Sequence, residues 1–347
     1  MIDFLSIVGT RPQYIKLKPL EIEMQKQGAS HIWIDTGQHY SNSMASGITE
    51  DLELSQPLLN LNIGSGSHGY QTGTAIIKIE EALLSIKPRL VIVYGDTNST
   101  LAGAIAASKL NITLAHVEAG LRSFNKEMPE EINRLLVDKI SDLNFAPTER
   151  SVKQLVSEGL GESAILTGDI TCDLIRLFRE NFAEDAIKAQ HDEYLVLTLH
   201  RTENLKDSQK FEQILRALSK VDHKIRFYIH PHTAKVMQTL RLTVSDNIEI
   251  LEPLPYLKML KTLSNAAGLI TDSGGLQKEA YLLGIPCTTL RNETEWIETL
   301  ENNWNILIKN IDELPRGINL EVSAPQKAHF GNGHTANKIV RHLKSKL

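Results

Sequence analysis

The chain has 347 residues, of which 37 are Lys or Arg and 42 are Asp or Glu, so the formal net charge is −5 with His neutral. At roughly 100–200 residues per domain, this length predicts two domains, each large enough to bury its own core. The mildly acidic balance excludes a general attraction to nucleic acid or to anionic lipid, so a bound anion would need a local site.

Cysteine content and hydropathy indicate the compartment. Cys172 and Cys287 are too few for a disulfide framework or a four-ligand zinc site, and we expect both to be small core residues in a reducing environment. Residues 1–16 contain no apolar run of signal-peptide length, and no stretch approaches the roughly 18 apolar residues of a membrane span. We therefore expect a soluble, cytoplasmic protein with neither a membrane nor a nucleic-acid partner.

Short apolar runs alternate with helical patterns through the first half of the chain. The sequence predicts strands over 4–8, 31–34, 90–93 and 113–117, and helices over 16–27, 74–86, 99–110 and 130–140. This alternation predicts right-handed βαβ units, and nearly continuous apolar strands are typical of a parallel sheet covered on both faces.

The same pattern starts again in the second half. Strands are predicted over 194–199, 225–229, 267–270 and 286–290, and helices over 208–219 and 276–283. We therefore expect an α/β protein with two doubly wound domains, residues 1–170 and residues 171–333. The final segment, 334–347, has apolar residues on one helical face, and we expect this helix to pack back on the first domain.

Polar residues follow most of the predicted strands. Because ligands of open α/β sheets bind beyond the carboxyl ends of the strands, these sets are the candidate site residues. They are residues 9–12, 36–39, 95–97 and 118–122 in the first half, and 200–201, 230–232, 272–275 and 291 with 295 in the second. Each set alone also fits a cap or a closed turn, but eight sets at the same sheet edges favour ligand binding.

Residues 272–275, Asp-Ser-Gly-Gly, precede a predicted helix and are typical of an anion-binding turn. Glycines let the backbone approach a ligand, and the start of a helix presents N–H groups to it. The alternative is an ordinary turn with Ser273 as a helix cap. Glu279 could accept hydrogen bonds from ribose hydroxyls or face solvent, and Arg11 and Lys16 are candidates to reach a diphosphate.

Other chemistries have less support. The sequence has no G-x-G-x-x-G after the first strand, no P-loop and no H-E-x-x-H, so we expect no redox dinucleotide, ATP or catalytic metal as a cofactor. The candidates for acid–base chemistry are two histidines and four carboxylic acids, namely His39, His200, Asp96, Glu118, Glu130 and Glu131.

Asp96 and Glu118 end neighbouring predicted strands, so their carboxylates should approach each other and have their pKa values pushed apart. Glu130 and Glu131 also fit an exposed first helical turn, where acidic residues are favoured.

Several motifs occur in a specific order, which makes the set more informative than any member. They are residues 8–12 (VGTRP), 36–40 (TGQHY), 94–97 (YGDT), 116–122 (HVEAGLR), 128–134 (MPEEINR), 200–204 (HRTEN) and 271–275 (TDSGG). This order resembles that of the UDP-N-acetylglucosamine 2-epimerase family. The resemblance implies a GT-B fold of two Rossmann-like domains, an active site in the interdomain cleft and a UDP-sugar substrate.

The resemblance also implies roles for individual residues. It places the phosphates of UDP against Arg11, His200, Ser273, Gly274 and Gly275, and the ribose against Glu279. It makes Asp96, Glu118 and Glu130 the acid–base carboxylates near C2 of the sugar, with His200 in the catalytic set. Lys16 and His39 would line the same cleft. A homodimer and a role in polysaccharide biosynthesis are further implications.

The implied reaction begins with removal of the C2 proton as UDP leaves C1. The resulting glycal is then re-protonated on its other face while UDP adds back. Closure of the two domains would retain this intermediate. The implied activity is epimerisation of UDP-N-acetylglucosamine at C2 without hydrolysis.

Some residues depart from the simplest members of the family. Thr202 stands where many carry a second arginine, and the loop over 123–128 is short. Residues 276–280 and 293–296 resemble the branch acting on UDP-2,3-diacetamido-2,3-dideoxyglucuronate. That substrate is therefore an alternative, as are a hydrolysing epimerase, a glycosyltransferase and a nucleotide-sugar sensor without catalytic activity.

Overall fold

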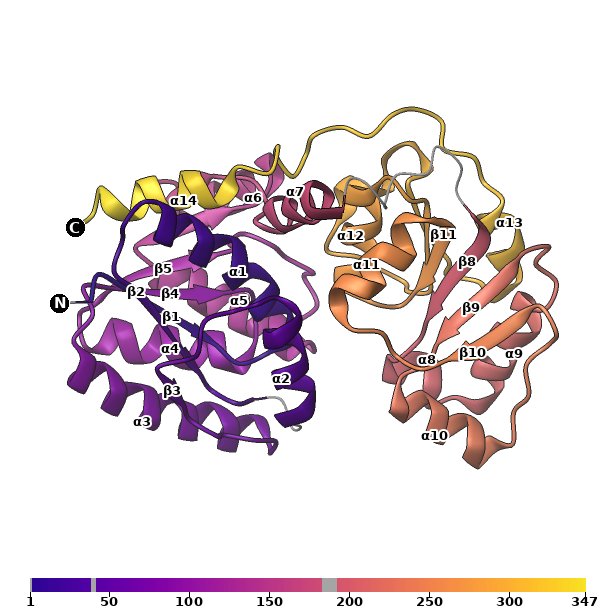
Figure 1. The fold of residues 1–347 in the computed structure, drawn as a ribbon, viewed down its shortest axis with the longest axis horizontal. Coiled ribbons are helices and arrows are strands. Elements are labelled where there is room, and N and C mark those ends of the chain that lie inside the picture. The colour runs from indigo at the N-terminus through magenta and orange to yellow at the C-terminus, as the bar shows by residue number, and fades with distance from the viewer. Residues whose placement is uncertain (1, 39–41, 183–191) are drawn as a thin grey trace. The chain divides into compact units, whose positions relative to one another are not determined.

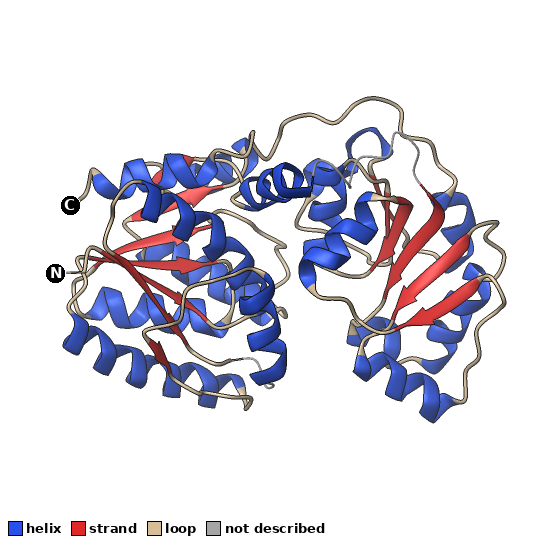
Figure 2. Ribbon diagram, viewed as in Figure 1, coloured by secondary structure: helices blue, strands red, loops and turns tan. Residues whose placement is uncertain are grey.

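The structure is a computed structural model that describes residues 2–38, 42–182 and 192–347. The chain forms two compact units, Met1–Leu177 with Ala328–Leu347 and Phe178–Lys327 (Figure 1). Each unit is a parallel sheet with helices packed against it, as Figure 2 shows in red and blue. The sequence places the domain boundary at residue 170, whereas the division between the units falls inside helix α7 (Thr171–Phe182).

The first unit contains a seven-stranded sheet in the order β3-β2-β1-β4-β5-β6-β7. Its strands are β1 (Phe4–Val8), β2 (His31–Asp35), β3 (Leu59–Asn60), β4 (Leu90–Tyr94), β5 (Thr113–Val117), β6 (Leu143–Ala146) and β7 (Ala164–Leu166). Its helices are α1 (Arg11–Lys26), α2 (Asn42–Asp51), α3 (His68–Ile86), α4 (Asn98–Lys109), α5 (Pro129–Ile140), α6 (Glu149–Ser157) and most of α7, with α14 (Thr335–Lys344). The central strands β1 and β4 are buried throughout, because helices cover both faces of the sheet.

The second unit contains a six-stranded sheet in the order β10-β9-β8-β11-β12-β13. Its strands are β8 (Asp192–Thr198), β9 (Lys224–Tyr228), β10 (Ile248–Leu251), β11 (Ala266–Thr271), β12 (Cys287–Thr289) and β13 (Asn305–Leu307). Its helices are α8 (Thr202–Leu205), α9 (Ser208–Leu218), α10 (Pro231–Leu240), α11 (Tyr256–Ser264), α12 (Gly274–Leu283) and α13 (Leu314–Ile318), with short 3₁₀ turns at Ile297–Asn303 and Ile311–Glu313.

The strand order of each sheet reverses at one point. In the first sheet β1 pairs with β2 on one side and with β4 on the other, and in the second β8 lies between β9 and β11. Ligands of such sheets bind outside the carboxyl ends of the strands at this reversal. The turns after β1 and β4, and those after β8 and β11, are therefore the places to examine for a site.

Helix caps explain where two helices begin earlier than the periodicity predicts. Helix α1 begins at Arg11 because Gln13 Oε1 accepts hydrogen bonds from the backbone N–H groups of Gly9 at 2.8 Å and Thr10 at 3.1 Å. Helix α3 begins at His68 because Ser67 caps it, accepting from the Tyr70 N–H at 3.3 Å. Apolar spacing finds the middle of a helix, whereas its caps set the ends.

Helix α14 returns the end of the chain to the first unit and packs on α1. Asn337 donates a hydrogen bond to Glu23 Oε1 at 2.7 Å, and Ile339 and Leu343 of α14 are fully buried. The buried Asp173 carboxylate accepts from the first two N–H groups of α14, each at 2.9 Å. These contacts fix both the face and the start of the helix.

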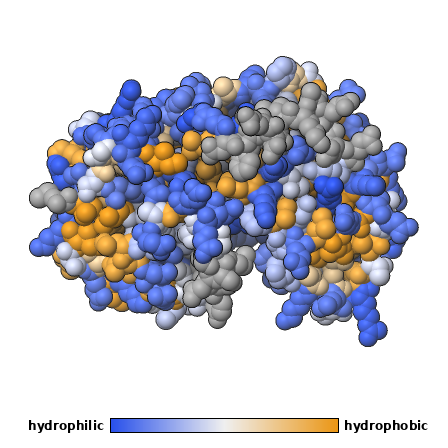
Figure 3. Space-filling view, in the orientation of Figure 1, coloured by the Kyte–Doolittle hydropathy of each residue, from blue (hydrophilic) through white to orange (hydrophobic). Residues whose placement is uncertain are grey.

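Hydrophilic side chains cover most of the face shown in Figure 3, with smaller apolar patches among them. Both cysteines are buried among the core residues. Among the helices of the described ranges, none combines the length and the apolarity that crossing a membrane requires.

Candidate functional site

The first unit gathers charged residues at the carboxyl ends of β4 and β5. These strands are direct neighbours in the sheet, so the turns that follow them, at Gly95 and at Glu118, lie side by side. Lys16 of α1 donates a hydrogen bond to Glu118 Oε2, and the two side chains are only 10% and 9% exposed. A buried carboxylate needs such a partner, because an isolated charge is costly to remove from water.

Gly95 allows the backbone to pass close to this ion pair. A Cβ atom at Gly95 would lie 3.2 Å from Lys16 Nζ and 3.4 Å from Glu118 Oε2, and the glycine has a φ of +63°. Any other residue would be strained here and would crowd the pair.

Glu118 itself has a strained backbone, with a φ of +76°. Its N–H and that of Ala119 both donate to the Phe145 carbonyl, at 3.1 and 3.0 Å, and so hold the strained turn in place. Non-glycine residues in this conformation cost free energy and concentrate at functional sites.

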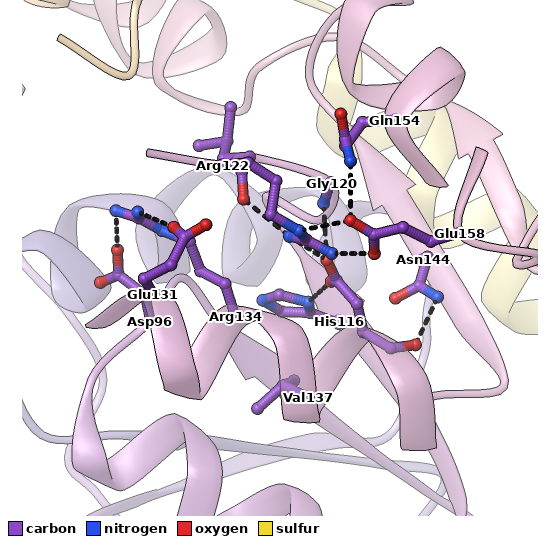
Figure 4. Close-up of polar contacts among 12 residues, drawn as sticks. Asp96, His116, Gly120, Arg122, Glu131, Arg134, Val137, Asn144, Gln154 and Glu158 are labelled. Atoms are coloured by element: carbon purple, nitrogen blue, oxygen red, sulfur yellow. Dashed lines mark hydrogen bonds and ion pairs between the residues drawn. The ribbon is translucent and has the colours of Figure 1, made fainter. Parts of the chain in front are cut away.

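Asp96 is held by two residues of α5. Arg134 Nη2 donates to Asp96 Oδ2 at 2.6 Å (Figure 4). Asn133 Nδ2 donates to the Asp96 carbonyl at 2.8 Å. The Asp96 side chain remains 29% exposed and therefore accessible to a ligand. We expected the carboxylates of Asp96 and Glu118 to approach each other; in the structure each also forms an ion pair, Asp96 with Arg134 and Glu118 with Lys16.

The two acidic residues that begin α5 differ sharply. Glu130 is exposed, whereas Glu131 is buried and accepts hydrogen bonds from the Ser123 and Phe124 N–H groups and from Arg134, at 2.8–3.0 Å. Burial would raise the pKa of Glu131, but these hydrogen bonds lower it below its ordinary value. Glu131 therefore fixes the loop before α5, whereas the exposed Glu130 carboxylate is accessible to a ligand.

A buried polar network lies beneath this edge. His116 of β5 is fully buried, with Nδ1 2.7 Å from Asp138 Oδ1 and Nε2 2.7 Å from the Gly95 carbonyl. Arg122 Nη1 lies 2.7 Å from Asp138 Oδ2 and also pairs with Glu158, as Figure 4 shows for the Arg122–Glu158 contact. Burial would raise the pKa of Asp138, but hydrogen bonds from His116 and Arg122 lower it.

In the second unit, the buried Asp272 orients His200. Asp272 accepts hydrogen bonds from the backbone N–H groups of His200 and Arg201 at 3.0–3.1 Å, and from Asn204 Nδ2 at 3.1 Å. Its Oδ1 lies 3.1 Å from His200 Nδ1. Burial would raise the pKa of Asp272, but these hydrogen bonds lower it. The His200 side chain is 44% exposed, so a ligand would be contacted through Nε2.

The turn before α12 offers backbone N–H groups to a ligand. Ser273 caps the helix and accepts from the Leu276 N–H at 3.4 Å. Gly275 is exposed, and a Cβ atom there would meet nothing within 4 Å. A Cβ atom at Gly274 would instead lie 2.6 Å from Glu295 Oε1, so only a glycine leaves Glu295 in place. This open helix start suits an anion.

Buried charged residues support this turn from inside α12. Glu279 is buried and accepts a hydrogen bond from the Tyr256 hydroxyl at 3.0 Å. Lys278 is also buried, with Nζ 4.0 Å from the centre of the Trp296 ring. Glu295 accepts from Arg291 Nη1 at 3.0 Å.

The predicted site residues thus form one group in each unit. The first group lies at the edge formed by β1, β4 and β5 and comprises Arg11, Lys16, Asp96, Glu118 and Glu130. The second follows β8 and β11 and comprises His200, Ser273, Gly274, Gly275 and Glu279. Arg11 is exposed as the first residue of α1, and His39 lies outside the described residues.

Sequence reasoning assigned no supporting role to the residues that hold these groups in place, although Asp272 was among the candidate site residues. Arg134, Asp272 and His116 all lay inside the ordered motifs, so a signal for them existed. Asp138 and Tyr256 had none, because their partners are 22 and 23 residues away.

Comparison with known proteins shows the family of this chain. The sequence model of the UDP-N-acetylglucosamine 2-epimerase family matches residues 22–344. The chain belongs to this family. Its two α/β units are the Rossmann-like domains of the GT-B fold.

Three relatives indicate how close the similarity is. A UDP-N-acetylglucosamine 2-epimerase homolog of Methanococcus maripaludis is 45% identical over 98% of this chain and 99% of its own length. UDP-2,3-diacetamido-2,3-dideoxy-D-glucuronate 2-epimerase of Pseudomonas aeruginosa is 40% identical over 98% of each. The crystal structure of Methanocaldococcus jannaschii UDP-GlcNAc 2-epimerase in complex with UDP-GlcNAc and UDP is 41% identical, with a TM-score of 0.90 over 99% of this chain and 100% of that one.

Proposed function

We propose that this protein is a non-hydrolysing epimerase that inverts C2 of UDP-N-acetylglucosamine. The observation that carries the proposal is the pairing of two carboxylates with cations at one sheet edge, Glu118 with Lys16 and Asp96 with Arg134. Binding a nucleotide sugar without reaction would not need these acids. Relatives at 40–45% identity carry epimerase names, which supports the same reaction class.

The second unit would hold the UDP group. The diphosphate would accept hydrogen bonds from the open helix start at Ser273 and Gly275 and from His200 Nε2. Glu279, fixed by the Tyr256 hydroxyl, would accept hydrogen bonds from the ribose. Arg11 would add a cation to neutralise the charge that develops on departing UDP.

The carboxylates of the first unit would move the C2 proton. This proton is not adjacent to a carbonyl group, so its removal has to accompany cleavage of the C1–O bond. One carboxylate takes the proton, the electron pair of the C2–H bond forms the C1=C2 bond, and UDP leaves with the C1–O pair. In the return step UDP adds to C1, and a carboxylic acid on the other face protonates C2. Asp96, Glu118 and Glu130 are the proposed acid–base residues.

The charges near the site favour a neutral sugar over a uronate. A uronate would bring a further carboxylate, which needs a cationic partner when buried. The candidate partners are Arg122, Arg201 and Arg291. Arg122 pairs with Asp138 and Glu158, and Arg291 pairs with Glu295. Arg201 is the remaining candidate. Because a UDP-2,3-diacetamido-2,3-dideoxy-D-glucuronate 2-epimerase is 40% identical to this chain, the diacetamido uronate is the alternative substrate.

A cytoplasmic homodimer is the setting that we propose for this activity. The two buried thiols suit a reducing compartment. On α3, Tyr70, Ile77 and Leu84 are spaced seven residues apart and are 55–61% exposed, a stripe suited to burial against a second copy. Light scattering of the wild type and of Ile77→Glu tests this: a monomeric wild type would contradict it.

Proton NMR in heavy water tests the function directly. With UDP-N-acetylglucosamine, the protein should introduce deuterium at C2 and form the C2 epimer without releasing free sugar. Turnover confined to the diacetamido uronate would move the protein to that branch, and free N-acetylmannosamine with UDP would make it a hydrolysing enzyme. Binding without exchange for every UDP-sugar would indicate a sensor.

A further inference from the structure

The His116 ring is positioned between two acceptors. Its Nε2 lies 2.7 Å from the Gly95 carbonyl, and a carbonyl oxygen only accepts, so Nε2 carries a hydrogen. Its Nδ1 lies 2.7 Å from Asp138 Oδ1, and Asp138 Oδ2 is occupied by Arg122 and by the Gly120 N–H at 3.0 Å. An ionised Asp138 also only accepts, so the ring donates hydrogen bonds at both nitrogens.

The Gly95 carbonyl is a sensitive point in the site. It belongs to the residue before Asp96, and a Cβ atom at Gly95 would contact both Lys16 Nζ and Glu118 Oε2. A rotation of this peptide would move the Asp96 main chain and would change the space around the ion pair. The orientation of the Gly95 carbonyl therefore affects the positions of both proposed acid–base carboxylates, Asp96 and Glu118.

Asp138 lies on helix α5 and, through His116, connects the Gly95 carbonyl to that helix. The same helix carries Glu130, and it carries Arg134, which holds Asp96 from the other side. Asp138, through His116, and Arg134 thus both hold the turn after β4 against the same helix.

We propose that Asp138 and His116 form a positioning dyad for catalysis, in which the His116 Nε2–H fixes the Gly95 carbonyl and thereby the placement of Asp96 beside the Lys16–Glu118 pair. The inference rests on the proposed epimerase function. Neither member touches substrate, so neither is a catalytic residue. A misplacement of about 1 Å in a reacting group can reduce turnover by about a hundredfold.

Two substitutions at His116 separate positioning from stability. In His116→Gln the amide nitrogen takes the place of Nε2, which keeps the Gly95 contact and loses the Asp138 contact. In His116→Asn the amide nitrogen takes the place of Nδ1, which keeps the Asp138 contact and loses the Gly95 contact. His116→Gln leaves the buried Asp138 Oδ1 without its donor, which is destabilising, so His116→Gln should have the lower melting temperature.

The expected order of activity is the reverse of the order of stability. At a temperature below both melting points, His116→Gln should keep kcat within about tenfold of the wild type, while His116→Asn should lose about a hundredfold. KM and the Kd for UDP should change by less than about threefold in either variant, since the phosphate groups are held elsewhere. Activity that follows melting temperature, or equal losses in both variants, would overturn the proposal.

A control and a second measurement complete the test. Glu158→Gln alters the far end of the network, at Arg122, and should lower the melting temperature while kcat stays near wild type. With ¹⁵N-labelled histidine, the wild-type His116 should show a slowly exchanging proton on each ring nitrogen. A ring without the Nε2 proton, or failure of both His116 variants to fold, would make the dyad purely structural.

The outcome is distinguishable from failure of the proposed function. If the wild type exchanges the C2 hydrogen of no UDP-sugar, the proposed function is wrong, whatever the labelled ring shows. If the wild type is active but the two variants rank by stability, only the dyad is wrong.

Discussion

Lys16 and Glu118 form an ion pair although 102 residues separate them in the sequence. Lys16 lies in the helix after β1 and Glu118 in the strained turn after β5, and the β1–β4–β5 order of the sheet brings the two together. The pair is almost fully buried, which keeps it free from screening by salt. It is the most constrained feature of the proposed acid–base site.

Removal of the cation tests this pair. Lys16→Met should reduce kcat by at least about a hundredfold, because Glu118 would lose the charge that orients it. The Kd for UDP should change much less, and thermal unfolding should occur at a lower temperature because a buried carboxylate is left alone. Lys18→Met is the matched control: Lys18 lies two residues on in α1 and pairs with Glu21. Equal effects of the two substitutions on kcat would contradict the assignment.

The two glycines that begin α12 should respond differently to alanine. Gly275→Ala places a methyl group in open space, so stability should persist while UDP affinity falls about tenfold, or about 1.4 kcal/mol. Gly274→Ala forces Glu295 to move, so the melting temperature should fall as well. Calorimetric titration with UDP and thermal melts check both. Wild-type UDP affinity in Gly275→Ala would remove this turn from the phosphate site.

Neighbouring glutamates on α5 provide a matched pair. Glu130→Gln should lower kcat by roughly 10²-fold and leave stability unchanged, because the side chain is exposed. Glu131→Gln should lower the melting temperature, because its carboxylate satisfies two backbone N–H groups and Arg134. Isotope exchange at C2 and thermal melts separate the two effects. A destabilised Glu130→Gln with normal turnover would reverse the roles.

Asp272 should make the free energy of unfolding depend on pH in the acid range. Its pKa in the folded protein is lowered from the ordinary 3.8, so its contribution is complete above that value and is lost as the pH falls through the lowered folded pKa. The difference in unfolding free energy between the wild type and Asp272→Asn should therefore be constant from pH 6 to 8 and shrink below about pH 4. Urea titrations at several pH values measure this. A difference that grows on acidification would contradict the lowered pKa.

The alternating strands and helices were predictable because each carries its own periodic signal. β1 occupies Phe4–Val8 as expected, whereas α1 begins five residues before the apolar period does, since its start depends on the Gln13 cap. Residue chemistry also located the candidate carboxylates at the ends of β4 and β5. It could not separate Glu130 from Glu131, because their exposure depends on where the loop after Arg122 folds.

Contacts between segments that are distant in the chain could not be predicted from the sequence. Both partners of the Glu118–Lys16 pair were named as candidates, but nothing in their spacing predicts that they meet. The positive φ of Glu118 is equally invisible, since glutamate has no preference for that conformation. His116 reads as one more residue of a buried strand until its two ring contacts are seen.

The return of α14 to the first unit has a consequence for biosynthesis. A ribosome makes Met1–Leu177 first, then all of Phe178–Lys327, and only then helix α14, which Asp173 caps and which packs on α1. During that interval the face of α1 that packs on α14 lacks its cover, so the first unit completes its packing only after the second unit has been made. The second unit is encoded without interruption and can fold while the first is still waiting.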